Sequence, residues 1–277
     1  MSTLCSLLPC LQVHLKFYRL GMQIIELNAG TLRPEGGTAV WGADELVCRC
    51  LLIETGDAAV LVDTGIGLKD IADPDARLGR EWLAMARPAL DPAETLVRQL
   101  EARGIEPASV GHIVLTHQHR DHVGGLADFP AARVHMLPAA RYAVNGAGGD
   151  ERHAGVAAQW AHGVRWADDP VPGEPWHGLE AFTLTGLPPT IRLLPLPGHA
   201  DGHAGVLLEA DGGLLLHVGD AAFHPAQYLG GEVPAGLAVF ATATEHDAAA
   251  RRETERLLGE IHHGGWARIV ISHWSGE

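Results

Sequence analysis

Four potential metal ligands follow directly on an apolar, strand-like run near the middle of the chain. The run is Ile113-Val-Leu-Thr, and the next six positions contain His117, His119, Asp121 and His122. Burying several imidazoles and a carboxylate at the end of a strand is unfavourable unless a partner satisfies them. A bound metal ion is the simplest such partner, because imidazole and carboxylate are common ligands. In an extended backbone His117 and His119 lie on one side and can bind one ion, while Asp121 and His122 can face a second.

Three later strand-like runs end in side chains of the same kind. These runs are 191–196, followed by His199, then 214–218, followed by Asp220, and finally 268–272, followed by His273. Residues at the ends of buried strands can converge on one rim. We therefore expect these three side chains to join the first cluster in a single metal centre.

The order of strand-like and helical segments constrains the fold class. Further apolar runs occupy 47–55, 58–63, 112–116, 133–137 and 204–209, and helical patterns occupy 92–103 and 246–262. Sheets covered by helices on the outside are typical of a layered α/β or α+β domain. Because 47% of the 277 residues are hydrophobic, the chain can bury a core of the required size.

Residues 22–277 are expected to form one domain. A strand-like alternation begins at Met22, so residues 1–21 are interpreted as a loose N-terminal extension or a mis-assigned start. The segment around 146–189 is rich in proline, glycine, alanine and tryptophan, and we expect it to be an insert of loops and short helices.

The charge balance argues against several classes of partner. The chain has 20 Lys and Arg residues against 34 Asp and Glu, a formal charge of −14, which leaves no basic surface for nucleic acid or an anionic membrane. No apolar run approaches the ~20 residues that span a bilayer. We expect a small-molecule substrate and a monomer or homodimer. We also expect a cytoplasmic location, because there is no clear export signal and the four cysteines are interpreted as reduced.

The ligand candidates together resemble the metallo-β-lactamase superfamily. The signature of that family is an Asp after an early strand, a His-x-His-x-Asp-His loop, and then a later His, Asp and His. The corresponding residues here are Asp63, the cluster 117–122, His199, Asp220 and His273, so the resemblance covers nearly the whole chain from Met22. It implies an α+β fold, a four-layer αβ/βα sandwich with a dinuclear site in the groove between its two sheets.

The resemblance also implies a role for each site residue. It implies that His117, His119 and His199 hold one ion, that Asp121, His122 and His273 hold the other, and that Asp220 bridges both. Asp63 corresponds to a carboxylate near the site that is not a ligand, and His203 is expected to support its turn through hydrogen bonds. All seven ligands are His or Asp, with no Cys among them, which suits two Zn²⁺ ions, with Mn, Fe or Co able to substitute.

The expected chemistry is hydrolysis. Two ions of this kind share a water molecule and lower its pKa toward neutrality, so that hydroxide can attack a polarised carbonyl. Asp121 or Asp220 could orient this nucleophile and move a proton. The Pro-Gly-His-x-x-Gly-His form around His199 is similar to N-acyl homoserine lactonase-type, quorum-quenching members, which favours a lactone or carboxylic ester as substrate.

One position departs from the lactonase pattern. Those members place a Tyr three residues after the bridging Asp, where this chain has Phe223, which cannot donate a hydrogen bond. Either His224 takes over as a catalytic donor or the substrate differs. The insert tryptophans Trp160, Trp166 and Trp176 could form an apolar wall for an acyl chain, or could instead pin the loops down as a small satellite core.

Three other functions remain open alternatives. Thioester hydrolysis of the glyoxalase II type is one, although the separate C-terminal helical domain of those enzymes is not found here. An oxidoreductase that uses iron in the same ligand cage is the second. A non-enzymatic binding or scaffold protein is the third and is disfavoured, because all expected ligands are present.

Overall fold

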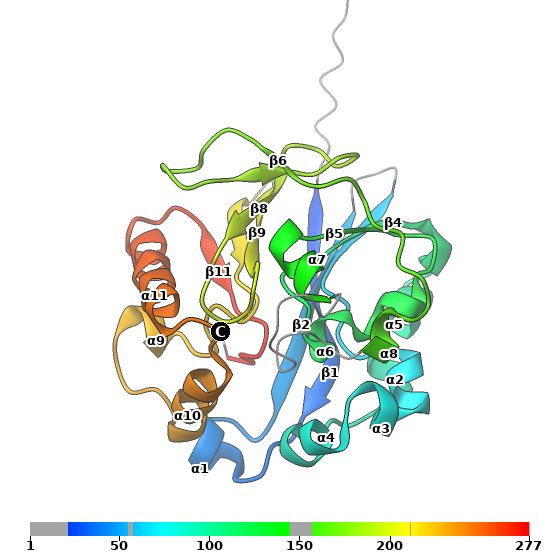
Figure 1. Ribbon diagram of the computed structural model, residues 1–277, viewed down its shortest axis with the longest axis horizontal. Helices are drawn as coiled ribbons and strands as arrows, with labels where there is room; N and C mark the ends of the chain where they lie inside the picture. The colour runs from blue at the N-terminus through cyan, green and yellow to red at the C-terminus, as the bar shows by residue number, and fades with distance from the viewer. Residues whose placement is uncertain (1–21, 55–57, 145–156, 211, 277) are drawn as a thin grey trace, which may run out of the picture.

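Two mixed β-sheets stacked face to face form the centre of the molecule (Figure 1). The computed structural model describes residues 22–54, 58–144, 157–210 and 212–276. The first sheet contains, in spatial order, β1 (Gln23–Leu32), β2 (Leu46–Glu54), β3 (Ala59–Val62), β4 (Val110–Val114) and β5 (Arg133–His135). The second contains β11 (Arg268–Val270), β10 (Gly213–His217), β9 (Ala204–Ala210), β8 (Ile191–Pro195), β7 (Phe182–Thr183) and β6 (Val171–Pro172). The pairs β3–β4, β4–β5 and β10–β11 are parallel, and the other neighbours are antiparallel.

Helices cover the outer faces of both sheets (Figure 1). Before the insert they are α1 (Gly37–Trp41), α2 (Leu68–Ala72), α3 (Pro74–Arg77), α4 (Arg80–Ala86), η1 (Pro92–Glu94), α5 (Leu96–Ala102), η2 (Pro107–Ser109), α6 (Arg120–Val123), η3 (Gly124–Asp128) and α7 (Pro138–Val144). The later ones are α8 (Ala157–Trp160), α9 (Ala226–Leu229), α10 (Ala235–Thr244) and α11 (Ala248–His263).

Three apolar layers hold these elements together. Leu51 and Ile53 of β2 face the second sheet and pack in the same cluster as Leu193 of β8. The opposite face of the first sheet packs against α5 through Leu100, and the second sheet packs against α11 through Leu258. Strands buried on both faces need nearly continuous apolar sequence, which these runs provide. The four-layer αβ/βα sandwich expected from the sequence is confirmed.

Element boundaries differ from the expected ones at a few positions. The run 92–103 is not one helix, because Thr95 is extended at ψ 143° and separates η1 from α5. Its hydroxyl donates to the carbonyl of Pro92, a local bond that competes with helix continuation. Asp91 does cap the first turn by accepting from the amide of Ala93, and Asp247 caps α11 in the same way through Ala249 and Ala250.

The expected domain limits fall partly outside the described residues. Residues 1–21 and part of the insert, 145–156, lie there, and so does the turn between β2 and β3. The described part of the insert contributes α8 and the short strands β6 and β7, which extend the second sheet. Among the described helices, none combines the length and the apolar character that crossing a bilayer requires.

His112 of β4 and His135 of β5 form a histidine pair that should make the stability of the fold depend on pH. His135 is buried, its Nε2 lies 2.8 Å from Nδ1 of His112, and burial together with His112 lowers the pKa of His135 to about 4. An unfolded chain, with a histidine pKa of about 6.5, binds more protons between these two values. The unfolding free energy therefore falls as the pH drops through this window, by about 2 kcal/mol from this residue between about pH 7.5 and about pH 5.

Denaturant unfolding of the chelator-treated chain at these two pH values tests this expectation. His135→Gln should reduce the pH dependence by about 2 kcal/mol, whereas His263→Gln, at an exposed histidine, should leave it as in the wild type. An unchanged pH dependence in His135→Gln would contradict the prediction.

Candidate metal centre

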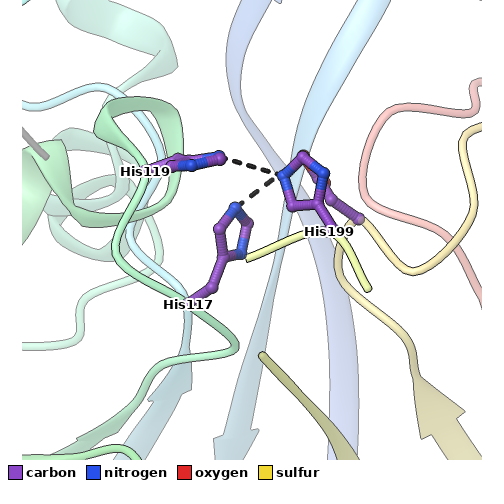
Figure 2. Close-up of side chains that lie close together, drawn as sticks. His117, His119 and His199 are labelled. Atoms are coloured by element: carbon purple, nitrogen blue, oxygen red, sulfur yellow. Dashed lines mark hydrogen bonds and ion pairs between the residues drawn. The ribbon is translucent and has the colours of Figure 1, made fainter. Parts of the chain in front are cut away.

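The candidate ligands and Asp63 gather where five strands end. Asp63 directly follows β3, the cluster 117–122 follows β4, His199 follows β8, Asp220 follows β10 and His273 follows β11. Figure 2 shows the rings of His117 and His119, from the segment after β4, pointing toward His199 from the facing segment. Residues far apart in the chain therefore meet at one rim of the sandwich.

One ligand set consists of His117, His119, His199 and Asp220. A donor atom from each of these side chains lies within 4.8 Å of the others. Nε2 of His199 lies 3.0 Å from Nδ1 of His119 and 3.4 Å from Oδ2 of Asp220. The same carboxylate oxygen is 3.8 Å from Nε2 of His117. Three imidazoles and a carboxylate at such distances match the donor number of a tetrahedral zinc site.

A second set consists of His122, Asp220 and His273, again with donor atoms within 4.8 Å of one another. Oδ1 of Asp220 lies 3.2 Å from Nε2 of His122 and 3.3 Å from Nε2 of His273. Asp121 approaches from one side, with its Oδ2 3.4 Å from Nε2 of His273. The two oxygens of Asp220 thus face different ligand sets, as a bridging carboxylate requires.

Several buried donor atoms at the site have no hydrogen-bond partner in the described part of the chain, which shows whether these residues suit a cation. Nε2 of His117, Nε2 of His122 and Oδ1 of Asp220 are buried and have no hydrogen-bonding geometry with any described residue. Polar atoms buried in this way are unfavourable and call for a partner. Bound cations would satisfy these atoms, so the residues present fit a metal centre.

The electrostatics of the ligands support the same assignment. Burial and the neighbouring His122 and His119 lower the pKa of His117 well below its usual value, which keeps that imidazole neutral with a lone pair to share. Burial raises the pKa of Asp220, but His273 and His122 outweigh it and hold the pKa well below the usual range. Despite burial, Asp220 raises the pKa of both His122 and His273. The carboxylates therefore attract positive charge at this position, which a divalent ion can supply.

Asp63 orients the ligands from behind. It is fully buried at a positive φ of 55°, and its Oδ1 accepts from the amide of Thr116 at 2.8 Å. Its Oδ2 accepts from the Thr116 hydroxyl at 2.8 Å and from Nδ1 of His122 at 2.9 Å. The Thr116 oxygen also lies 3.0 Å from Nδ1 of His117. These bonds leave Nε2 of both histidines for a metal ion, the arrangement that fixes ring orientation in metal sites.

His203 positions the bridging carboxylate. Its Nδ1 donates to the carbonyl of Leu196 at 3.0 Å, and its Nε2 accepts from the amide of Asp220 at 3.1 Å. Burial lowers the pKa of His203 to about 4, so it is neutral at pH 7 as this bonding requires. Gly219 sits beside it at φ 55°, where a Cβ would lie 2.9 Å from that same Nε2. A side chain at this turn would displace His203 or Thr116, which lies equally close.

An apolar pocket opens beside the second ligand set. Asp121 and His273 line it together with Phe223, and its other walls come from α1, α4 and α10. The aromatic residues in these walls are Trp41, Trp82 and Phe240. Phe223 is buried and contacts the rings of His199 and His273, with centroids 5.6 and 6.1 Å away. Phe223, expected from the sequence to line a substrate pocket, thus lines this cavity beside the ligands.

The insert tryptophans do not line this pocket, contrary to the expectation of an acyl wall. Trp160 and Trp166 stack with centroids 5.8 Å apart and pack against the core between the first sheet and its helices. Trp176 is buried against Trp266 on the helix-covered face of the second sheet. These tryptophans pack the described part of the insert against the two cores, where their large rings bury apolar surface.

His224 also lies apart from the ligands. Its Nδ1 accepts from the amide of Ala226, and its ring packs against Trp274 at 4.3 Å. It is not among the residues that line the pocket. The structure therefore places His224 just before α9 and outside this pocket.

Several residues of the site were missed in the sequence. Thr116 connects Asp63 to His117, and Cys48 has its sulfur within 4.8 Å of donor atoms of Asp121 and His273. The pocket residues Trp41 and Trp82 come from segments with no motif. Of these residues, only Thr116 could have been suspected from the sequence, because it directly precedes the first ligand.

Comparisons with known proteins identify relatives along most of the chain. The model of a family described as the metallo-beta-lactamase superfamily matches residues 43–268. A probable metallo-hydrolase of Mycobacterium tuberculosis is 42% identical over 205 residues, which are 73% of this chain and 63% of that protein. The chain thus matches just under two thirds of the length of this relative. The N-acyl homoserine lactonase AttM of Rhizobium johnstonii is 30% identical over 223 residues, covering 76% of this chain and 77% of AttM.

Solved structures with the same fold are more distant in sequence. An N-acyl homoserine lactone hydrolase, determined with the product N-hexanoyl-L-homoserine at its catalytic metal centre, has a TM-score of 0.66 and 20% identity, covering 91% of this chain and 93% of its own. AidC, a dizinc quorum-quenching lactonase, has a TM-score of 0.60 and 16% identity, covering 93% and 90%. These similarities establish the fold.

Proposed function

We propose that this chain, which belongs to the metallo-beta-lactamase superfamily, is a dinuclear metal-dependent hydrolase of lactones or carboxylic esters. The observation that carries the proposal is that the two carboxylate oxygens of Asp220 face different side chains. Its Oδ2 faces His117 and His199, and its Oδ1 faces His122 and His273. Zinc is the proposed ion, with manganese, iron or cobalt able to substitute, because imidazole suits zinc and tolerates the others.

The chain's own residues have distinct roles in this reaction. When bound, two divalent ions supply a water of lowered pKa and polarise the carbonyl oxygen of the substrate. Asp121 lines the pocket beside His273, where its carboxylate can accept a proton from the attacking water and return it to the leaving oxygen. Asp63 and His203 keep the ligands oriented through the hydrogen bonds described above. The side chain of Phe223 has no hydrogen-bond donor and provides an apolar contact for the substrate.

The apolar pocket supports an acyl-bearing substrate. Its walls are aromatic and aliphatic, and its polar lining residues are Asp121 and His273 beside the second set, so an apolar tail can lie there while the reacting carbonyl reaches the ions. Relatives named N-acyl homoserine lactonase make these lactones the first substrates to test. Such an activity would make the protein a quorum-quenching enzyme, and we keep a cytoplasmic location and a monomeric or homodimeric state as part of the proposal.

Metal analysis combined with a substrate panel tests the proposal. The purified chain should contain two zinc ions and hydrolyse N-acyl homoserine lactones or simple esters, and His119→Ala should abolish this hydrolysis. The panel also contains glutathione thioesters and phosphodiesters. Preferred cleavage of a thioester would favour the glyoxalase II-type alternative, and turnover that requires iron and oxygen would favour the oxidoreductase. A two-zinc protein that cleaves no lactone and no ester would contradict the proposal.

A further inference from the structure

Cys48 lies against the second ligand set. Its sulfur, a carboxylate oxygen of Asp121 and a ring nitrogen of His273 all lie within 4.8 Å of one another. The side chain is 2% exposed, so the thiol faces these two residues away from bulk solvent. A thiol, a carboxylate and an imidazole in mutual reach form a donor set that shares His273 with the set that contains His122.

The backbone holds Cys48 in this position. The carbonyl of Val47 accepts from Nδ1 of His273 at 2.7 Å, and the amide of Arg49 donates to the carbonyl of Ser272 at 2.9 Å. The amide of Cys48 itself donates to Oδ1 of Asn28 at 3.1 Å. Bonds on both sides of Cys48 therefore tie β2 to the segment that carries His273, and the first of them leaves Nε2 of His273 for a metal ion.

We propose that Cys48 is a ligand of the ion held by Asp121 and His273, which makes the second metal position a mixed sulfur, nitrogen and oxygen site. This inference rests on the proposed dinuclear centre. The S–H bond of Cys48 breaks as the sulfur–metal bond forms, and the proton leaves to solvent. A zinc–sulfur bond is about 2.3 Å long, so the three donors must close around the ion from their present separations.

A second cysteine on the same strand provides a matched control. Cys50 is two residues further along β2, so its side chain lies on the same face, and it is 1% exposed. It packs in the apolar cluster between the first sheet and its helices and is in no candidate donor set of the described residues. Replacement of either cysteine removes one buried thiol, but only Cys48 faces a carboxylate and an imidazole.

A thiolate gives the second site a preference for softer cations. Sulfur ligands select zinc and other thiophilic ions, whereas carboxylate and water suit manganese and magnesium. We expect Cys48→Ser to weaken cadmium binding at the second site by about tenfold or more. Losing a residue that hydrogen-bonds to a metal ligand already has an effect of this size. Manganese binding should change less, and Cys50→Ser should change neither.

Cobalt spectroscopy tests the ligand directly and does not depend on activity. The full chain is loaded with Co²⁺, its metal content is measured, and the sulfur-to-cobalt charge-transfer band is recorded in the near ultraviolet. Wild type and Cys50→Ser should show the band, while Cys48→Ser and Cys48→Ala should lack it. X-ray absorption of the zinc-loaded wild type should show one sulfur per two zinc ions, a measurement that needs no variant to fold.

The possible outcomes separate this inference from the proposed function. Two ions per chain without a sulfur signal would overturn Cys48 as a ligand and leave the dinuclear centre intact. A single ion with the sulfur signal would support Cys48 and overturn the dinuclear centre, and a single ion without it would overturn both. A band that persists in both Cys48 variants would also overturn the assignment.

Discussion

Replacing Asp220 with asparagine is expected to lower kcat/KM by about 10³-fold or more and to reduce the bound metal below two ions per chain. One Asp220 oxygen faces His117 and His199, and the other faces His122 and His273. The amide removes the negative charge that both positions share. Metal-ion stabilisation of the transition state is worth several kcal/mol, and about 4 kcal/mol corresponds to 10³-fold.

The matched control for this change is Asp201→Asn. Asp201 lies on the loop between His199 and His203, but it is only half-buried and pairs with His246 at 3.2 Å. Its replacement should leave kcat/KM within about threefold, since exposed ion pairs contribute about 0–1 kcal/mol. Steady-state kinetics and metal analysis of the two variants decide the matter. If Asp220→Asn retained two ions and nearly full activity, the bridging role would be wrong.

Replacing Asp63 with alanine is expected to destabilise the fold and the metal centre together. The change leaves the amide and hydroxyl of Thr116 and Nδ1 of His122 without their buried acceptor. Removing one member of such a buried charged network costs about 3–5 kcal/mol of unfolding free energy. Loss of a partner that orients a metal ligand typically lowers metal affinity by about 10–100-fold.

Two measurements separate the effects of Asp63→Ala. Denaturant unfolding of the chelator-treated chain reports the effect on the fold, and competition with a chromophoric chelator reports the effect on zinc affinity. Asp75→Ala is the control, because Asp75 pairs with Arg80 on the surface and its loss should cost less than about 1 kcal/mol. Equal stability of the two variants would mean that Asp63 does not support the site as described.

The local order of residues was enough to predict much of the site. An apolar run followed by a ligand can be recognised because strand patterns and turn residues are local properties. This is why His117, Asp220 and His273 could be placed at strand ends before the fold was known. The helix expected over 92–103 was wrong at Thr95, because a single side-chain hydrogen bond there interrupts a pattern that is otherwise helical.

The pocket could not be predicted in the same way. Trp160 and Trp166 lie in a loop-rich insert, where residues of a pocket wall are often found. They instead stack on each other and pack against a core. The aromatic walls of the pocket include Trp41 and Trp82. In the sequence, a tryptophan that lines a pocket looks the same as a tryptophan that packs against a core. Which surface they bury depends on how remote helices pack, and no short-range pattern records that.

Sequence alone thus determined the apolar strands, the ligand types that follow them and the layered fold that these strands can build. The tertiary structure decided which of these residues face one another, that Asp220 faces both sets, and that Cys48 of β2 meets His273 across 225 positions of the chain. Strand formation depends on neighbours within a few residues. Contact between β2 and the segment after β11 depends on how the two sheets stack and on backbone bonds between distant segments.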